Sequence, residues 1–570
     1  MKAIKKSLAI LVCLCLVFSC MAMSVFAAEA TGSITIQNPG NSAATVAGKT
    51  FNVYKIFNAT TNGNNTSYSW YVDENDKIPF YDFFYGANGV VEQNVADGNV
   101  QDAVEHVADI TDSLALSQFA ESLHKYIVDN RIATYIDPVV AAGTATSVNI
   151  PNLSFGYYLV YDNTDLSGDT SVVRSAVMLS NVNKDAVITL KANRPQILKQ
   201  VKENNGSFGK GTSVSIGDVV TFKITTLIPS HTLYTTYHYS IEDTMHDGLI
   251  LNADSIKVYK VVDNASETLL VKDQDYSVEI PESGTVDFKV DFTDYMARYA
   301  TNDTVTVVYD ATVSNAIEAQ TANKNTAKLI YSNDPTNDAS TGNVSDSANV
   351  YSYQFVFTKF AQDTNGVLTN IRLSGAEFEL YRVDKDNTKT KINFTTREKK
   401  VTFDGEEHTF VEYVVAAEKT EDTVDTLITY NEGEATITLS HLNMGGHLGD
   451  VAIFGLAEGK YELVETKAPD GYILPDAPFV IEITDEIGAL GSVGTLNVTG
   501  SHEGSKIGSI VNTNGIAENI LTVWAEITNK PGAALPETGG IGTTIFTVLG
   551  IVLMAGAAAF FTSRKRSSVA

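Results

Sequence analysis

The C-terminal end of the chain carries residues whose order indicates a transpeptidation signal. A pentapeptide, an apolar run and a basic triplet follow one another: Leu535-Pro536-Glu537-Thr538-Gly539, residues 541–561 and Arg564-Lys565-Arg566. The apolar run is long enough to span a bilayer, and the three cations favour a cytoplasmic end. The pentapeptide is then held just outside the membrane, where a sortase can attack the Thr538 carbonyl, release Gly539 onward and transfer the chain to an amine.

The N-terminal end has the layout of a secretory signal peptide. Three lysines within the first six residues precede an apolar run from Leu8 to Phe18, and small residues follow at Ala27 and Ala28. The apolar run is shorter than the roughly 20 residues that a spanning helix needs. We therefore expect residues 1–28 to be removed on export, which predicts a secreted protein that is anchored to the cell wall.

Composition excludes several classes of function. The three cysteines, Cys13, Cys15 and Cys20, lie inside the predicted signal peptide, so the mature chain cannot use the disulfides that stabilise many exported proteins. The net charge of -28 argues against nucleic acid as a partner. The nine histidines show no metal-ligand spacing, and the pattern Gly-x-Ser-x-Gly is absent. We expect no metal, no cofactor and no enzymatic activity.

Short strands separated by Asn, Asp and Gly turns dominate the chain between its two ends. Clear examples are Gly32–Ile36, Val219–Ile224, Thr304–Tyr309 and Ala435–Leu439. This pattern is typical of antiparallel β-sandwiches. Phe119, Leu123, Tyr126 and Ile127 instead recur at helical spacing. The predicted fold class is all-β, with tandem Ig-like sandwiches and a helical insertion in the first of them.

Several phrases of the chain resemble a known family. The most specific of them are residues 373–381 (LSGAEFELY), 461–472 (YELVETKAPDGY) and 527–532 (ITNKPG). The second phrase is similar to the E-box of the backbone subunits of Gram-positive sortase-assembled pili, whose domains resemble the collagen-adhesin sandwich types CnaA and CnaB. The resemblance covers the mature chain and implies a structural shaft subunit of a covalent surface pilus, or fimbria, that supports adhesion.

Similar segment endings near residues 190, 352 and 531 predict the domain boundaries. The expected parts are a signal peptide (1–28), an N-terminal pilin sandwich (29–190), a CnaA-type domain (191–352), a CnaB-type domain (353–531) and an LPXTG sorting signal (532–570).

The family builds intramolecular amide bonds, also called isopeptide bonds, between a lysine and an asparagine beside a buried acid. Burial disfavours charge, so a neutral amine and a protonated acid can coexist at neutral pH. The acid then polarises the asparagine carbonyl and moves protons as ammonia leaves. Folding supplies the alignment, which can correspond to an effective molarity of about 10⁵ M or more. No external enzyme is needed.

The resemblance assigns two such sites. Each is a lysine, an asparagine and a promoting acid: Lys199, Asn325 and Asp243 in the CnaA-type domain, and Lys359, Asn529 and Glu465 in the CnaB-type domain. Lys202 and Glu242 are the nearest rivals in the first set, but strand alternation turns them to the opposite face. In the N-terminal domain the opening strand has no lysine, and Tyr161 stands where the E-box has glutamate. We predict no bond there.

The resemblance also implies that a lysine of the next subunit resolves the sortase thioester. Family members usually present it in Tyr-Pro-Lys-Asn at the end of the first domain, and the matching position here reads Thr189-Leu190-Lys191-Ala192. Lys191 is the candidate and Lys184 the alternative. The implied partners are identical subunits, pilus and housekeeping sortases, peptidoglycan and accessory pilins.

A second hypothesis is an adhesin that is anchored singly to the wall and binds a host or matrix ligand. That hypothesis predicts an additional ligand-binding domain, and the sequence has no obvious one. The shaft subunit is therefore the leading interpretation.

Overall fold

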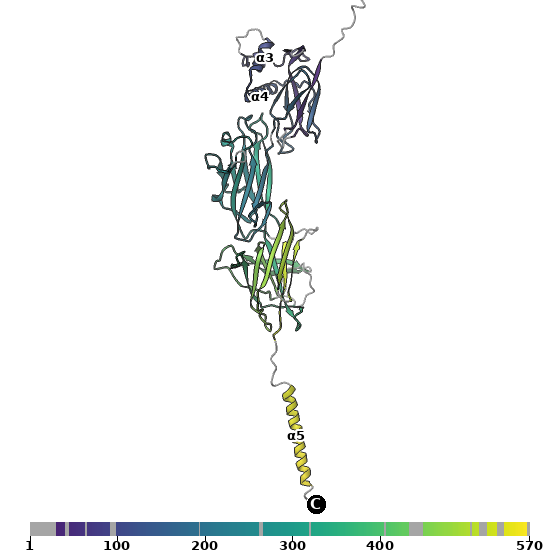
Figure 1. Cartoon of the computed structure of the whole chain (residues 1–570), viewed down its shortest axis with the longest axis vertical. Helices are drawn as coiled ribbons and strands as arrows, with labels where there is room; N and C mark the ends of the chain where they lie inside the picture. Colours follow the sequence, from purple (N-terminus) through teal and green to yellow (C-terminus); the bar gives the residue numbers. More distant parts are fainter. Residues whose placement is uncertain are drawn as a thin grey trace, which may run out of the picture. The chain divides into compact units, whose positions relative to one another are not determined.

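The computed structural model describes most of the chain between its two ends (Figure 1). The described residues are 30–39, 45–62, 65–91, 99–192, 194–261, 266–318, 321–403, 406–431, 448–501, 504–511, 521–532 and 541–566. The predicted signal peptide, the pentapeptide Leu535–Gly539 and the strand Ala435–Leu439 lie outside them.

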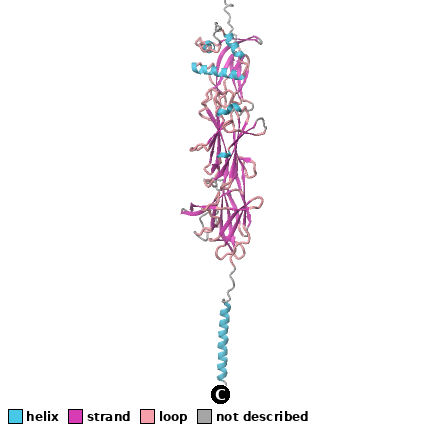
Figure 2. Ribbon diagram, turned by 90° about the vertical axis from the view of Figure 1, so that its left-hand side faces the viewer, coloured by secondary structure: helices cyan, strands magenta, loops and turns pink. Residues whose placement is uncertain are grey.

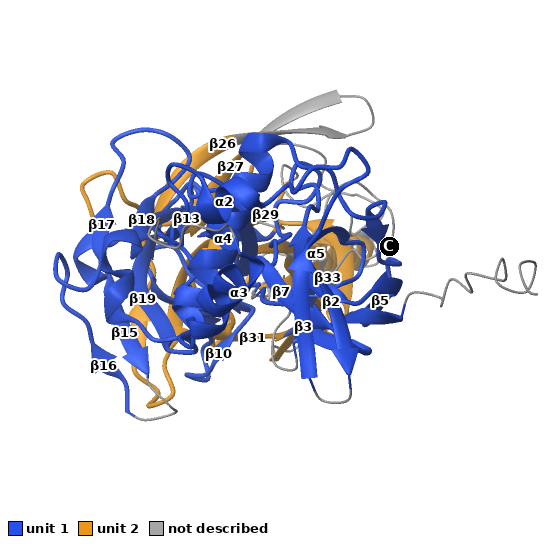
Figure 3. Ribbon diagram, turned by 90° about the horizontal axis from the view of Figure 1, so that it is seen from above, with its two compact units in different colours: residues 1–318, 322–351, 487–493 blue, residues 319–321, 352–486, 494–570 orange. Residues whose placement is uncertain are grey.

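The chain divides into two compact units (Figure 3). Unit 1 comprises residues 1–318, 322–351 and 487–493, and unit 2 comprises residues 319–321, 352–486 and 494–570. Strands make up most of both units, so the fold is all-β as predicted (Figure 2).

The N-terminal part of unit 1 contains two sheets that pack face to face. Its strands are β1 (Thr31–Gln37), β2 (Thr50–Asn62), β3 (Asn65–Trp70), β4 (Val139–Val140), β5 (Ser147–Ser154), β6 (Gly156–Asp162), β7 (Met178–Val182) and β8 (Ala186–Thr189). One sheet has the order β5-β1-β8, and the other has the order β3-β2-β6-β7, with β4 on β2. Ile34 and Ile150 of the first sheet share a core with Phe51 and Val160 of the second, which makes a sandwich.

Helices cover the outer face of the second of these sheets. They are α2 (Tyr81–Tyr85), α3 (Val100–Asp109) and α4 (Ser113–Asn130), which lie between β3 and β4 in the chain. Figure 1 labels α3 and α4. The Asp112 side chain caps α4 by accepting a hydrogen bond from the Ala115 amide at 2.8 Å. Phe119 and Leu123 of α4 pack against Phe57 and Leu159 of the sheet. The predicted helical insertion is therefore present.

The rest of unit 1 contains a second pair of sheets. Its strands are β9 (Ile197–Lys202), β10 (Phe208–Gly209), β11 (Gly211–Ser213), β12 (Val219–Leu227), β13 (Tyr239–Met245), β14 (Leu249–Leu251), β15 (Lys257–Val261), β16 (Thr268–Leu269), β17 (Ser277–Glu279), β18 (Phe288–Asp291), β19 (Thr304–Val313), β20 (Asn323–Ser332) and β21 (Thr341–Tyr351), with 3-10 turns η1 (Ala253–Ser255) and η2 (Thr293–Arg298). The sheet orders are β10-β9-β12-β19-β15-β16, with β14 on β19, and β11-β21-β20-β13-β18-β17. The division of unit 1 into two domains near residue 190 stays a prediction.

Unit 2 also has two sheets. Its strands are β22 (Tyr353–Gln362), β23 (Leu368–Arg372), β24 (Glu377–Val383), β25 (Lys389–Lys391), β26 (Phe394–Phe403), β27 (Glu406–Val415), β28 (Leu427–Ile428), β29 (Asp450–Leu456), β30 (Gly459–Lys467), β31 (Phe479–Ile487), β32 (Val493–Ser501), β33 (Lys506–Val511) and β34 (Leu521–Asn529). The sheet orders are β26-β27-β29-β22-β34-β33, with β23 on β22, and β25-β24-β30-β31-β32, with β28 on β24. The first strand, β22, pairs in parallel with the last, β34.

The C-terminal apolar run forms the helix α5 (Ile541–Arg566). Its stretch Thr544–Ser563 has a mean hydropathy of 2.2 and is long and apolar enough to cross a membrane. This helix matches the spanning segment that the sequence predicts at residues 541–561.

Candidate functional site

Unit 2 brings together the lysine, acid and asparagine that the sequence singles out. Lys359 lies on β22 and Asn529 on β34, and the parallel register of these neighbouring strands pairs Asn529 with Ala361, two residues from Lys359. Glu465 reaches them from β30 of the opposite sheet. Its Oε2 accepts a hydrogen bond from Lys359 Nζ at 2.6 Å, and its Oε1 accepts one from Asn529 Nδ2 at 2.8 Å. One carboxyl group thus bridges the amine and the amide.

Burial shifts the charge balance of this site toward the neutral forms. The side chain of Lys359 is fully buried, and its Nζ lies 5.2 Å from the centre of the Phe378 ring. Burial lowers the pKa of Lys359 to about 8, although Glu465 opposes the shift. Burial likewise raises the pKa of Glu465 above its ordinary value. An uncharged amine beside a protonated acid is therefore accessible near neutral pH.

A cavity adjoins the unit 2 site. Its volume is about 690 Å³, and Ile473, Pro475, Thr528 and Asn529 are among the residues that line it. The backbone oxygen of Ile473 also accepts a hydrogen bond from Asn529 Nδ2 at 3.0 Å. The amide thus lies beside a space through which a small leaving group can depart.

Unit 1 assembles the second predicted set in the core between its second pair of sheets. Lys199 lies on β9 in one sheet, and Asp243 and Asn325 lie on the neighbouring strands β13 and β20 of the other. Lys199 Nζ donates a hydrogen bond to Asp243 Oδ2. The side chains of all three residues are fully buried. The site therefore joins the two sheets across the core.

A tyrosine that the sequence analysis missed completes this site. The hydroxyl of Tyr309, on β19, lies 2.6 Å from Lys199 Nζ and 2.8 Å from Asp243 Oδ1. It also accepts a hydrogen bond from Asn325 Nδ2 at 2.7 Å. Alternation along β19 could have predicted that Tyr309 faces the core, but its three polar contacts depend on strands that are remote in sequence.

Burial shifts the pKa values of the lysine and the acid of the unit 1 site in the same directions as in unit 2. Burial lowers the pKa of Lys199 to about 8, against the pull of Asp243. Burial also raises the pKa of Asp243, and the nearby carboxyl of Asp287 adds to the shift while Lys199 opposes it. Phe222 contributes to the apolar wall, with its ring centre 5.3 Å from Lys199 Nζ.

The two asparagines share an orientation. In the described part of the chain, Oδ1 of Asn325 and Oδ1 of Asn529 are buried and have no hydrogen-bond partner. Each Nδ2, in contrast, donates to the acid or to Tyr309. The amides are therefore held by the nitrogen that leaves in an amide exchange. This differs from the expectation that each acid contacts the asparagine carbonyl, because the described contacts leave both carbonyl oxygens without a hydrogen bond.

The rival residues of unit 1 point away from the core. Lys202 is exposed at the end of β9, and Glu242 is half-buried. Glu242 forms an ion pair with Lys328 at 3.5 Å. Neither residue therefore lies in the buried cluster.

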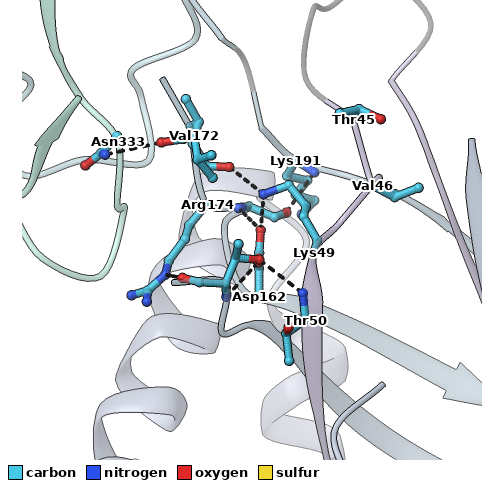
Figure 4. A network of polar contacts seen from close by, with 12 residues as sticks. Thr45, Val46, Lys49, Thr50, Asp162, Val172, Arg174, Lys191 and Asn333 are labelled. Carbon is cyan, nitrogen blue, oxygen red and sulfur yellow. Dashed lines mark hydrogen bonds and ion pairs between the residues drawn. The ribbon is translucent and has the colours of Figure 1, made fainter. Parts of the chain in front are cut away.

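The N-terminal sandwich has a buried lysine of a different kind. Lys49 Nζ donates hydrogen bonds to Asp162 Oδ2 and to the backbone oxygen of Val173, each at 2.6 Å (Figure 4). Asp162 also accepts hydrogen bonds from the amide of Ser175 and from the hydroxyl of Thr164. The arrangement is a salt bridge, which the sequence analysis did not predict.

Tyr161, which replaces the E-box glutamate, faces other partners. Its hydroxyl accepts a hydrogen bond from Arg174 Nη1 at 3.1 Å, and its ring stacks on His124 at a centroid distance of 3.8 Å. The absence of a crosslink in this sandwich stays a prediction.

The two candidate polymerisation lysines are both exposed. The backbone of Lys191 is fixed, because its amide donates to Ser175 Oγ at 2.9 Å and its oxygen accepts from the Ala176 amide at 3.0 Å (Figure 4). Lys191 also lines a cavity of about 460 Å³, together with Arg174 and Tyr234. Lys184 lies in the turn before β8.

No group of three or more His, Cys, Asp or Glu side chains that could hold a metal ion occurs among the described residues.

Comparison with protein families gives two matches. The prealbumin-like fold domain of the SpaA type matches residues 357–492, and the LPXTG cell wall anchor motif matches residues 527–568. The trypsin-resistant surface T6 protein of Streptococcus pyogenes serotype M6 is 24% identical over 440 residues, which cover 66% of this chain and 70% of that protein. The chain is therefore similar, over about two thirds of its length, to a streptococcal surface protein. Its anchor motif makes it a cell-wall-anchored surface protein.

The comparisons give further matches. The type 1 fimbrial subunit of Actinomyces viscosus is 26% identical over 208 residues, which cover 36% of this chain and 31% of that protein. Among solved structures, the T6 backbone pilin of Streptococcus pyogenes has a TM-score of 0.48 and 16% identity, with coverage of 89% of this chain and 99% of that chain. The major pilin SpaD from Corynebacterium diphtheriae has a TM-score of 0.42 and 18% identity, covering 90% and 100%.

Proposed function

We propose that this chain is the shaft subunit of a covalent surface pilus and that two internal Lys–Asn amide bonds crosslink it. The observation that carries this proposal is the repeated arrangement of a buried amine, a buried acid and a buried amide in two differently built sandwiches. A buried ion pair alone is weak evidence for stability. In unit 2 the Asn529 Nδ2 donates to the acid, and in unit 1 the Asn325 Nδ2 donates to Tyr309. Each lysine–acid pair thus has an amide beside it with which the lysine can react.

The reaction at each site is an amide exchange. The neutral lysine amine attacks Cγ of the asparagine, the new C–N bond forms, and the bond to Nδ2 breaks as ammonia leaves. The acid accepts a proton from the attacking nitrogen and supplies one to the leaving nitrogen, so no other reactant is consumed. Pairing follows the sequence assignment: Lys359 with Asn529, and Lys199 with Asn325.

Polymerisation joins Thr538, near the C-terminus, to Lys191, which follows the N-terminal sandwich. A sortase holds the chain as a thioester at Thr538, and Lys191 of the next subunit resolves it. The exposed side chain of Lys191, its fixed backbone and the adjoining cavity support this choice. The last subunit is transferred to peptidoglycan instead.

Mass spectrometry of the full chain, purified in detergent, tests the crosslinks. We expect the intact mass to be lower than the sequence mass, after removal of the signal peptide, by two molecules of ammonia. Digestion should give branched peptides that join Lys199 to Asn325 and Lys359 to Asn529.

The variants Asn325→Ala and Asn529→Ala provide the matched controls, because each should retain one ammonia loss and one branched peptide. An unmodified wild-type mass would contradict the crosslinks, but it would not contradict the proposed polymerisation. A chain that remains monomeric on the wall would instead support the singly anchored adhesin.

A further inference from the structure

The acid of unit 1 is too short to bridge its site in the way that the acid of unit 2 does. Glu465 contacts the amine with one oxygen and the amide with the other. Asp243 has one methylene fewer, and in the described part of the chain no direct hydrogen bond joins it to Asn325. Its Oδ1 instead lies 2.8 Å from the Tyr309 hydroxyl, which lies 2.7 Å from Asn325 Nδ2.

We propose that the Tyr309 hydroxyl is a catalytic group that relays a proton between Asp243 and the amide of Asn325 during crosslink formation. This inference rests on the proposed crosslinking of unit 1. The hydroxyl touches the nucleophile as well, since it lies 2.6 Å from Lys199 Nζ. It is therefore the one group in the described site that contacts the amine, the acid and the leaving nitrogen.

The relay balances protons without changing any group permanently. As Lys199 Nζ bonds to Cγ of Asn325, Nζ gives a proton to Asp243 Oδ2. Oδ1 of the neutral acid passes its own proton to the Tyr309 oxygen, and Tyr309 passes its hydroxyl proton to Nδ2. The Cγ–Nδ2 bond then breaks and ammonia leaves, so Asp243 ends as a neutral acid and Tyr309 as a phenol.

The surroundings keep Tyr309 suited to this role. Its ring is fixed between Phe222, stacked at a centroid distance of 5.5 Å, and Phe288, edge-on at 4.8 Å. Burial, with the neighbouring Asp243 carboxyl, raises the pKa of Tyr309 well above its ordinary value. The phenol therefore stays protonated and acts as a donor and acceptor, not as a phenolate.

Removal of the single hydroxyl by Tyr309→Phe tests the relay. The full-length chain is recovered unfolded from inclusion bodies, refolded by dilution in detergent and sampled over time for the Lys199–Asn325 branched peptide. Because positioned acid–base groups contribute about 10²-fold or more, we expect that bond to form at least about 10²-fold more slowly. The Lys359–Asn529 bond in the same molecules should form at the wild-type rate.

Tyr239→Phe is the matched control. Tyr239 is fully buried in the same pair of sheets, and its hydroxyl contacts Thr226 and the Leu227 oxygen away from the site. We expect this variant to crosslink at the wild-type rate. A Tyr309→Phe chain that crosslinks as fast as the control would overturn the relay, whereas a wild-type chain without the bond would overturn the proposed function itself.

The double variant Asp243→Glu with Tyr309→Phe separates catalysis from packing. The added methylene extends the acid into the space of the lost hydroxyl, which restores the direct bridge seen with Glu465. We expect this variant to form the bond at least about 10-fold faster than Tyr309→Phe alone. A protease-resistant double variant that forms the bond no faster than Tyr309→Phe would overturn the claim that the hydroxyl spans the gap between acid and amide.

Discussion

The chemistry proposed for this chain depends on the charge states of a few buried side chains. Lys199 and Lys359 both have their pKa lowered to about 8 by burial, and the pKa values of Asp243 and Glu465 are raised by burial. Because these shifts bring the pKa of each lysine closer to the pKa of its acid, a proton can pass from the lysine to the acid at a smaller cost in free energy. The neutral pair has the same proton count as the ion pair.

A pH dependence of crosslinking follows from this proton count. The reactive neutral pair loses its acid proton as the pH rises through the lysine pKa of about 8, so bond formation should slow above that pH. It should also slow at low pH, where the pair takes up a second proton and the amine becomes an ammonium. The plateau lies between the raised acid pKa and about 8. The time course of ammonia release from the full-length chain, refolded from inclusion bodies at different pH values, measures this profile.

A rate that keeps rising above pH 9 would contradict the need for a protonated acid. It would indicate that a free amine alone limits the reaction. Glu465→Gln is the control, because it removes the titrating acid from one site only.

At the level of elements, the two proposed bonds connect different pairs of strands. In unit 2 the bond would join β22 to β34, which are parallel neighbours in one sheet and the first and last strands of the unit's sandwich. In unit 1 the bond would join β9 of one sheet to β20 of the other, and β21 still follows β20. The first of these proposed bonds would resist the shearing of adjacent strands, and the second would resist separation of the sheets.

Loss of either bond should lower the stability of its own unit. The variants are Asn325→Ala and Asn529→Ala. By analogy with a disulfide, a crosslink that closes a loop of about 100 residues contributes roughly 4 to 5 kcal/mol to the free energy of unfolding. Differential scanning calorimetry of the full chain should show a different transition moving to lower temperature in each variant.

Glu242→Gln is the control for these variants, because Glu242 forms a partly exposed ion pair outside the core, and such pairs contribute about 0 to 1 kcal/mol. If Asn325→Ala unfolds at the same temperature as this control, unit 1 contains no stabilising crosslink.

For the whole molecule, the question is which amine receives Thr538. Lys191→Ala should reduce the polymer ladder in wall extracts to monomer, because the exposed amine beside the 460 Å³ cavity is lost while the backbone hydrogen bonds at this position remain. Immunoblotting of wall extracts measures the ladder. Lys184→Ala is the matched control and should leave the ladder intact. A ladder that survives Lys191→Ala and collapses in Lys184→Ala would reverse the assignment.

The sequence by itself determined the features that local pattern controls. Turn residues between short alternating strands predicted an all-β fold, and helical spacing predicted the insertion that contains α4, because both periods depend on near neighbours. Motif resemblance also selected Lys199, Asn325 and Asp243 and their counterparts in unit 2. The alternation of side chains along a strand predicted that Lys202 and Glu242 face away from the core.

Only the tertiary structure decided what depends on strands remote in sequence. The Lys49–Asp162 salt bridge joins residues 113 positions apart, and no local pattern reports it. In the sequence, Tyr309 has the pattern of an ordinary aromatic core residue of a strand. Packing of one sheet on the other places its hydroxyl in contact with an amine, an acid and an amide. Whether the side chain of Asp243 can reach Asn325 depends on the spacing of β13 and β20 in the folded sheet. The sequence could therefore name the proposed lysine, acid and asparagine, but not the tyrosine that lies between the acid and the asparagine.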